Sequence, residues 1–295
     1  MRRVSIVALF LAGALLTGCT PAPPVATQAP DTSQPPSSTS ATTGTAQPTT
    51  SAPPVASPVV VRVYLAYNEK MQPVLRQLPA GTKTTLKSAL VELLKGPNAA
   101  ETAAGMSTQI PAGTTLRSVK VSGKIATVDL SAKFGTDGGM SGVTNRLAQV
   151  VFTATQFSTV SSVRFKVNGK TVSVFTGEGI MLNHPQKRSD YEYSTAPIFV
   201  DNPAWQATIK KGMTARGTAN VFEATFHVQV RDAAGTLLVN KTVHATRGTG
   251  TRGSWSLKLT WAAAAPGMGQ LRVFAASPKN GAEIDGIDVP VVISD

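Results

Sequence analysis

Cysteine is nearly missing from this chain, because Cys19 is the single one among 295 residues. No disulfide can form within the chain, so its domains must be stable through packing alone. Aromatic residues make up only 6 %, histidines number three, and no G-x-S-x-G sequence is present. We therefore identify no catalytic residue, and we expect the protein not to be an enzyme. The apolar run at residues 4–16 is shorter than the roughly 20 residues that a membrane-spanning helix needs.

Acidic residues are also scarce: 16 Asp and Glu stand against 28 Lys and Arg, which gives a formal net charge of +12. Residues 59–193 hold most of this excess, with 16 basic and 8 acidic side chains. Such a balance favours anionic lipid headgroups or acidic wall polymers as partners, or it keeps the protein soluble. Nucleic acid and small-molecule substrates are not expected partners, because dense Arg/Lys runs, interleaved aromatics and substrate motifs do not occur.

The first residues have the pattern of an export signal. Arg2 and Arg3 precede the apolar run, which ends in Leu16-Thr17-Gly18-Cys19. This pattern predicts a signal peptide over residues 1–18, and its last four residues resemble the lipobox of bacterial lipoproteins. The resemblance implies a covalent diacylglycerol on Cys19, no other cofactor, and attachment to the outer face of the cell membrane. An ordinary secreted protein or an uncleaved helix is the alternative.

A flexible tether is expected to follow Cys19. Residues 20–58 contain ten Pro, fifteen Ser or Thr, one charged residue and no aromatic. Such a segment cannot bury enough apolar surface to offset the entropy lost on ordering. A flexible chain of this length reaches roughly 35 Å, so residues 19–58 predict a spacer between the membrane and the folded part.

Residues 59–182 predict an α+β domain. Alternating apolar residues indicate strands at 59–67, 72–78, 116–121 and 125–130, and a helical period indicates helices that begin near Thr85 and Val143. Asn168-Gly169 predicts a type I′ hairpin between two further strands. The expected arrangement is two helices packed on one face of a mixed or antiparallel sheet.

Several sequence stretches of this domain resemble the GerMN domain, which is associated with sporulation and germination. They are 90–97 (LVELLKGP), 110–114 (IPAGT), 126–131 (ATVDLS) and 149–153 (QVVFT). The resemblance implies a scaffolding or adaptor role in the cell envelope, and it supplies no catalytic residues.

Residues 197–295 predict an all-β sandwich beyond a linker at 183–196. Seven short strands are expected, with Trp255 and Trp261 in the core and Phe222 to Val230 alternating inward. The stretches 216–219 (RGTA), 230–232 (VRD) and 253–261 resemble the immunoglobulin-like Gmad2 domain, which often accompanies GerMN.

Four residues are candidates for contact with an anion. Asn145 and Arg146 follow a glycine-rich loop at 135–142, and Arg247 and Arg252 flank a second loop. Of the three histidines, His184 falls in the expected linker, whereas His227 and His244 fall on consecutive strands and would supply half of a zinc site if they were cross-strand neighbours. We interpret both as exposed polar strand residues, so no metal is expected.

These patterns together predict a lipid-anchored, extracytoplasmic envelope adaptor that binds another envelope protein. A wall-polymer binder is the alternative. A wall glycan or peptide hydrolase is a third interpretation. It needs two carboxylates that converge in a cleft, and the candidate pairs are Asp129 with Asp137 and Asp190 with Glu192.

Overall fold

The computed structural model describes residues 57–136, 138–175 and 179–294. Cys19, the lipobox residues Leu16, Thr17 and Gly18, and the tether up to residue 56 lie outside this part of the chain. Within the described ranges, no helix combines the length and the apolar character needed to cross a membrane.

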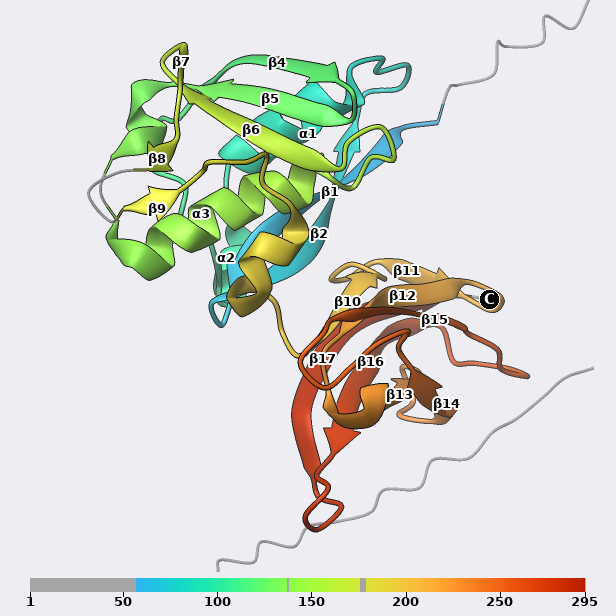
Figure 1. Ribbon diagram of the computed structural model, residues 1–295. Coiled ribbons are helices and arrows are strands. Elements are labelled where there is room, and N and C mark those ends of the chain that lie inside the picture. Colours follow the sequence, from blue (N-terminus) through green and yellow to red (C-terminus); the bar gives the residue numbers. More distant parts are fainter. Residues whose placement is uncertain (1–56, 137, 176–178, 295) are drawn as a thin grey trace, which may run out of the picture. The chain divides into compact units, whose positions relative to one another are not determined.

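The first domain begins with a long β-hairpin (Figure 1). Strands β1 (Val59–Tyr67) and β2 (Lys70–Leu78) pair antiparallel along their whole length. The turn residues Asn68 and Glu69 both have positive φ angles, 48° and 60°, as a two-residue type I′ turn requires. The short strand β3 (Met106–Ser107) joins the other edge of β1 only near its end, at Ala66 and Tyr67. Most of that edge of β1 is therefore without a neighbouring strand.

A second sheet in this domain has the order β4-β5-β6-β7. Its strands are β4 (Leu116–Ser122), β5 (Ile125–Leu130), β6 (Ser162–Val167) and β7 (Lys170–Thr171). Strands β5 and β6 are parallel because a helix connects them, whereas β6 and β7 form the hairpin predicted at Asn168-Gly169. Beyond it, β8 (Val174–Phe175) and β9 (Ile180–Met181) make a small separate pair.

Helices α1 (Thr85–Leu94) and α3 (Gly139–Ala154) lie between these two sheets (Figure 1). The prediction of two helices on one face of a single sheet was therefore wrong, although the α+β class holds. Because α3 is covered from both sides, eleven of its sixteen residues are buried. It begins four residues before the expected Val143. A third, short helix, α2 (Ala99–Ala103), is capped by Asn98, and Arg76 makes two hydrogen bonds of 2.6 and 2.7 Å to its Glu101.

Polar side chains of α3 complete the open edge of β1. The Gln149 amide donates to the Tyr64 carbonyl at 3.0 Å, and the Tyr64 N–H donates to Thr153 Oγ1 at 3.2 Å. The Gln156 amide, just beyond the helix, makes the same pair of bonds with the Arg62 backbone at 2.6 and 2.8 Å. Buried backbone groups need such partners. Three side chains thus replace a missing strand, which explains the polar positions within the 149–153 stretch.

The segment 183–196, predicted as a linker, is packed against the first domain. It contains the 3₁₀ turn η2 (Arg188–Ser194), which contacts α3 and β2. Gln186 makes a backbone bridge to Val163 of β6, and the buried Tyr191 hydroxyl donates to the Gln186 side chain at 3.0 Å. Burial of its phenol raises the pKa of Tyr191, with the charge of Asp190 adding to the effect.

The second domain is a sandwich of two sheets, with orders β10-β12-β15 and β11-β17-β16-β13-β14 (Figure 1). The strands are β10 (Ile198–Asn202), β11 (Thr208–Lys210), β12 (Thr214–Ala219), β13 (Thr225–Arg231), β14 (Leu237–His244), β15 (Gly253–Lys258), β16 (Gly267–Ala276) and β17 (Glu283–Ser294). Phe226, Trp255 and Trp261 are buried between them as expected.

Two details of this domain differ from the sequence prediction. Strand β11, which pairs parallel with the end of β17, was not anticipated. Phe222 was expected to face the core but is 54 % exposed, because it lies in the short turn η3 (Phe222–Ala224). Glu223 and Ala224 there have positive φ angles, 53° and 56°, which interrupt the alternation of an extended strand.

The substitution Gln149→Leu tests the polar edge of β1. It should lower the free energy of unfolding by about 2 kcal/mol, because the Tyr64 carbonyl and the Gln109 N–H each lose a buried partner. The matched variant Gln229→Leu changes a half-buried glutamine on β13 and should stay within about 0.5 kcal/mol of the parent. Urea unfolding followed by circular dichroism measures both. Equal effects of the two substitutions would contradict the role of Gln149.

Candidate functional site at the domain junction

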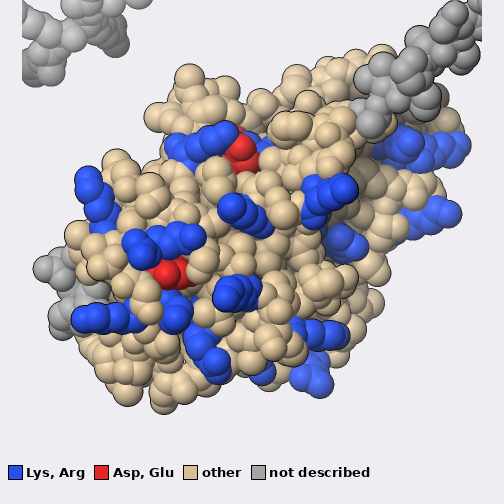
Figure 2. All heavy atoms as spheres, turned by 90° about the horizontal axis from the view of Figure 1, so that it is seen from above, with Lys and Arg blue, Asp and Glu red and all other residues tan. Residues whose placement is uncertain are grey.

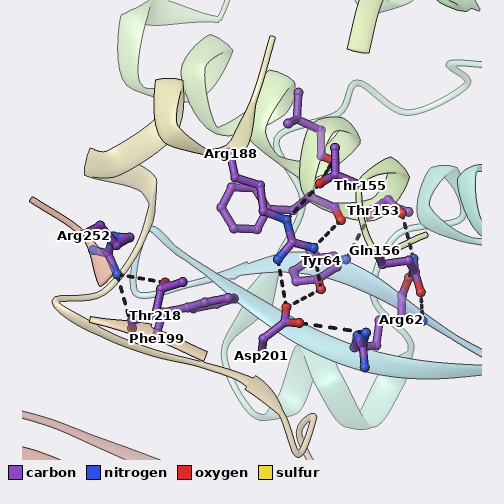
Figure 3. Close-up of polar contacts among 12 residues, drawn as sticks. Arg62, Tyr64, Thr153, Thr155, Gln156, Arg188, Phe199, Asp201, Thr218 and Arg252 are labelled. Atoms are coloured by element: carbon purple, nitrogen blue, oxygen red, sulfur yellow. Dashed lines mark hydrogen bonds and ion pairs between the residues drawn. The ribbon is translucent and has the colours of Figure 1, made fainter. Parts of the chain in front are cut away.

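A partly buried polar cluster connects the two domains, which belong to one compact unit of the structure (Figure 3). Asp201 of β10 accepts a 2.5 Å hydrogen bond from the Tyr64 hydroxyl of β1. The same carboxylate pairs with Arg188 of η2 at 3.1 Å and with Arg62 of β1 at 3.9 Å. Arg188 also donates to the Tyr64 hydroxyl at 3.0 Å. One acid of the second domain therefore holds a tyrosine and two arginines of the first.

Arg188 is fixed by its surroundings as well as by Asp201. Its Nε donates to Thr155 Oγ1 at 2.9 Å, and an Nη donates to the Phe152 carbonyl at 3.0 Å. The guanidinium carbon lies 5.1 Å from the Tyr64 ring centre and 4.7 Å from that of Phe152, within the range of cation–π contacts. Four hydrogen bonds and two ring contacts within the protein hold the Arg188 guanidinium, so we assign Arg188 a structural role.

The cluster shifts the pKa values of its members. Burial, reinforced by the charge of Asp201, raises the pKa of Tyr64 to about 12, so this hydroxyl stays a donor. Burial by itself would raise the pKa of Asp201, but Arg188 and Arg62 outweigh it and hold that pKa below its usual value. For Arg188 burial acts to lower the pKa, and the interactions with Tyr64 and Asp201 raise it overall. At neutral pH the Asp201 carboxylate and the Arg188 guanidinium are therefore charged, and the Tyr64 hydroxyl is protonated.

Strand β10 contributes to both hydrophobic cores. Its residues Ile198 and Val200 lie in the core of the sandwich, whereas Phe199 between them lies in the core of the first domain. The Phe199 ring centre is 5.8 Å from Phe152 and 6.5 Å from Tyr64. The Phe199 carbonyl accepts a bond from the Trp255 indole at 3.2 Å. Side chains on opposite faces of one strand therefore serve different domains.

A second ion pair holds the chain where it leaves the first domain. Arg252 Nε donates to the Glu192 carboxylate at 2.7 Å, and its Nη2 donates to the Ala196 carbonyl at 3.0 Å. Its Nη1 donates to the Thr218 hydroxyl at 3.2 Å (Figure 3). Partial burial would raise the pKa of Glu192, but the bonds from Arg252 and Asn220 lower it. Arg252, predicted as an anion contact, is occupied by these bonds within the protein.

The other predicted anion contacts lie apart from this junction. Arg146 is only 3 % exposed and donates to the carbonyls of Gln109, Phe134 and Thr136. Asn145 is buried on α3 beside a hollow of about 400 Å³, and Arg247 is exposed on a loop of the sandwich. The four residues do not converge on one site, and an anion contact at any of them stays a prediction.

Sequence reasoning did not find Tyr64, Arg188 or Asp201. Arg188 stood in a polar segment read as a linker, and Tyr64 and Asp201 are 137 residues apart. The one available signal was an aspartate directly after the apolar run of β10.

The junction borders an open groove of about 410 Å³, lined in part by Arg188, Asp201 and Arg216. His244 also lines it, but His227 stacks on Phe274 with ring centres 5.0 Å apart. The described residues hold no group of three or more His, Cys, Asp or Glu side chains able to bind a metal. Asp190 accepts a bond from the Lys187 N–H at 2.8 Å, and Glu192 pairs with Arg252. Asp190 and Glu192, one of the two carboxylate pairs suggested for hydrolysis, are thus engaged in bonds within the protein. In the other pair, Asp129 accepts a bond from the Gly169 N–H, and Asp137 lies outside the described residues.

The fold and the junction define a protein in which an α+β domain is joined to an immunoglobulin-like sandwich. Residues 62–173 match the Germane family, described as sporulation and spore germination. Residues 197–282 match Gmad2, described as an immunoglobulin-like domain of bacterial spore germination. The chain therefore contains a Germane (GerMN) domain followed by a Gmad2 domain, and both resemblances inferred from the sequence are confirmed. Neither domain family is a known enzyme family.

Solved structures similar to this chain include two from the sporulation protein GerM of Bacillus subtilis. The tandem GerMN domains are 21 % identical, with a TM-score of 0.40, and the match covers 63 % of this chain and 60 % of that one. The first GerMN domain alone is 26 % identical, with a TM-score of 0.38, and the match covers 45 % of this chain and 99 % of that one. Among curated proteins, none matches the chain.

Asp201→Asn tests the charged cluster through its pH dependence. At pH 7 the variant should lose about 3 kcal/mol of stability, because Arg188 and Arg62 lose a buried counter-ion. The lowered pKa of Asp201 means that its contribution is present above the ordinary value near 3.9 and is lost as the pH falls below it. The stability gap between parent and variant should therefore narrow between about pH 5 and pH 2 in urea unfolding.

The control is Asp288→Asn, which removes a partner of Arg272 at the surface. Its effect at pH 7 should be below about 1 kcal/mol. A gap for Asp201→Asn that stays constant from pH 7 to pH 2 would show that the carboxylate charge is not what stabilises the junction.

Proposed function

We propose that this chain is a non-catalytic adaptor of the cell envelope, which is held outside the membrane by a lipid on Cys19 and presents its two domains together to one protein partner. The shared strand β10 carries this proposal, since Phe199 and Asp201 tie the sandwich to the first domain. A flexible pair of domains would lose more entropy on binding a partner than a fixed pair does. The membership in GerMN and Gmad2 families, which occur in sporulation and germination proteins, is consistent with this role.

The exposed side of η2 and α3 is the proposed contact for the partner. Tyr193 is 91 % exposed, the highest fraction among the large hydrophobic side chains described, and Met140 is 61 % exposed. Both border the hollow of about 400 Å³ that also includes Lys70 and Asn145. The Lys70 ammonium donates to the Tyr193 carbonyl at 2.6 Å, which fixes the turn that presents the ring. Exposed Tyr and Met beside a hollow are typical of residues that dominate protein interfaces.

The proposed attachment rests on the sequence around Cys19, and the tether at 19–58 would give the domains room to reach a partner some distance from the bilayer. Loss of the thiol should release the protein from the membrane fraction. It should also remove a membrane-bound partner from reach.

In-cell cross-linking followed by affinity recovery of the full chain tests the proposal. The parent should recover one membrane or secreted protein reproducibly, and Cys19→Ala should lose it. Tyr193→Ala should reduce the recovery roughly 30-fold, as expected for a residue worth about 2 kcal/mol at an interface. Phe222→Ala, which removes an exposed aromatic ring from the sandwich, is the matched control and should recover the partner normally.

Recovery that is equal with Tyr193→Ala and the parent would place the contact elsewhere. Recovery of wall polymer alone, or of no protein, would refute the adaptor function.

A further inference from the structure

The outward face of the β4-β5-β6 sheet carries a group of basic side chains that the junction does not use. The antiparallel register places Lys120 of β4 opposite Thr127 of β5, and the parallel register places Thr127 opposite Arg164 of β6. In the next row, Ser118 lies opposite Asp129, and Asp129 lies opposite Lys166. The inward positions of the same strands, such as Val128 and Phe165, are buried in the core.

This face has an excess of four positive charges. Arg117, Lys120, Lys124, Arg164 and Lys166 lie on it or at its hairpin turn, with Asp129 as the acidic residue among them. Asp129 is satisfied by Arg117 at 3.5 Å and by the Gly169 N–H at 2.9 Å. Within the described residues, Lys120, Arg164 and Lys166 make no ion pair. Viewed from above the molecule of Figure 1, basic side chains are spread over this side and acidic ones are sparse (Figure 2).

The spacing suits a polymer with repeated charges. Arg164 and Lys166 are two residues apart on one strand, which is about 7 Å, and Lys120 lies two strands from Arg164, which is about 10 Å. The rigid sheet fixes the backbone positions of these side chains. Little conformational entropy is therefore lost when they bind several anionic groups of one polymer. A single small anion would engage only one or two of them.

The side chains between the cations favour a polymer over a membrane surface. Ser118, Thr127 and Thr171 are polar, and hydroxyl groups are suited to hydrogen bonds with phosphate or sugar oxygens. Ile125 is the apolar side chain on the outward side of these three strands, and it is half-buried. Proteins that lie on a membrane usually add exposed Trp, Phe or Leu to their basic residues.

We propose that this face, defined by Lys120, Arg164 and Lys166 with Arg117 and Lys124 beside them, binds a linear anionic polymer that carries repeated phosphate groups. Lys120 and Arg164 in one row and Lys166 in the next contact successive phosphates, and Arg164 offers a planar pair of donors to phosphate oxygens. This binding site is separate from the contact at Tyr193, so either proposal can fail without the other.

Fluorescence anisotropy with labelled long-chain inorganic polyphosphate tests the site. All proteins carry Cys19→Ala, so that an anchor does not contribute. The parent should bind in 50 mM salt and weaken as salt rises, with a log–log slope of about −3 for four phosphate contacts. The triple variant Lys120→Ala, Arg164→Ala, Lys166→Ala should bind on the order of 100-fold more weakly, at roughly fivefold for each cation, with a slope lower by about 2.

The matched control removes the same charge from the sandwich, through Lys241→Ala, Lys258→Ala and Lys279→Ala, which are exposed there. It should change the affinity less than threefold, and thermal unfolding should show that both triple variants are folded. An equal loss in the control, or no loss in the first triple variant, would overturn the proposal.

Flotation with vesicles of phosphatidylcholine and phosphatidylglycerol distinguishes a second source of phosphate. Vesicle binding that depends on Lys120, Arg164 and Lys166, without polyphosphate binding, would show that the face recognises lipid headgroups and that the polymer proposal is wrong. Binding of polyphosphate without flotation supports the polymer.

Discussion

The structure depends on Tyr64 being held from three directions at once. Its backbone is bonded to α3 through Gln149 and Thr153, and its ring packs against Phe152. Its hydroxyl donates to Asp201 in the second domain. Because the hydroxyl is buried beside a carboxylate, it remains protonated to high pH, and the carboxylate remains ionised between two arginines. The core of the first domain and its attachment to the second thus share one residue.

Strand β10 attaches the two domains by contributing residues to both of their cores. An ordinary contact between domains joins two surfaces that are complete without each other. Here Phe199 fills a place in the first core while its neighbours Ile198 and Val200 fill places in the second. The segment with Arg188 and Glu192, which precedes β10, is fixed to the sandwich by ion pairs with Asp201 and Arg252 and packs against α3 of the first domain. A two-domain surface of defined geometry follows from these contacts, and that geometry is what the proposed adaptor function uses.

Local signals in the sequence predicted the elements better than their arrangement. The turn at Asn168-Gly169 and the strand alternation in the sandwich were sufficient for the hairpin and for most strands, because each depends on neighbouring residues. The division of the first domain into two sheets was not predicted, because the local sequence pattern does not indicate which strands pair. The Tyr64–Asp201 bond spans 137 residues, and Arg188 reads as an ordinary polar residue until its partners are known. Phe222 was misplaced because the backbone leaves the extended conformation at Glu223.

The side chains that α3 sets along β1 also have a consequence for how the protein behaves among its own copies. An open sheet edge exposes unpaired N–H and C=O groups, and these can recruit a strand from another molecule and begin aggregation. Gln149, Thr153 and Gln156 occupy those groups at Arg62 and Tyr64 without offering a new row of backbone donors and acceptors. At these two residues the edge of the sheet has no free backbone group with which another strand could pair. Docking of α3 against β1 therefore protects this edge from pairing with a strand of another copy of the chain.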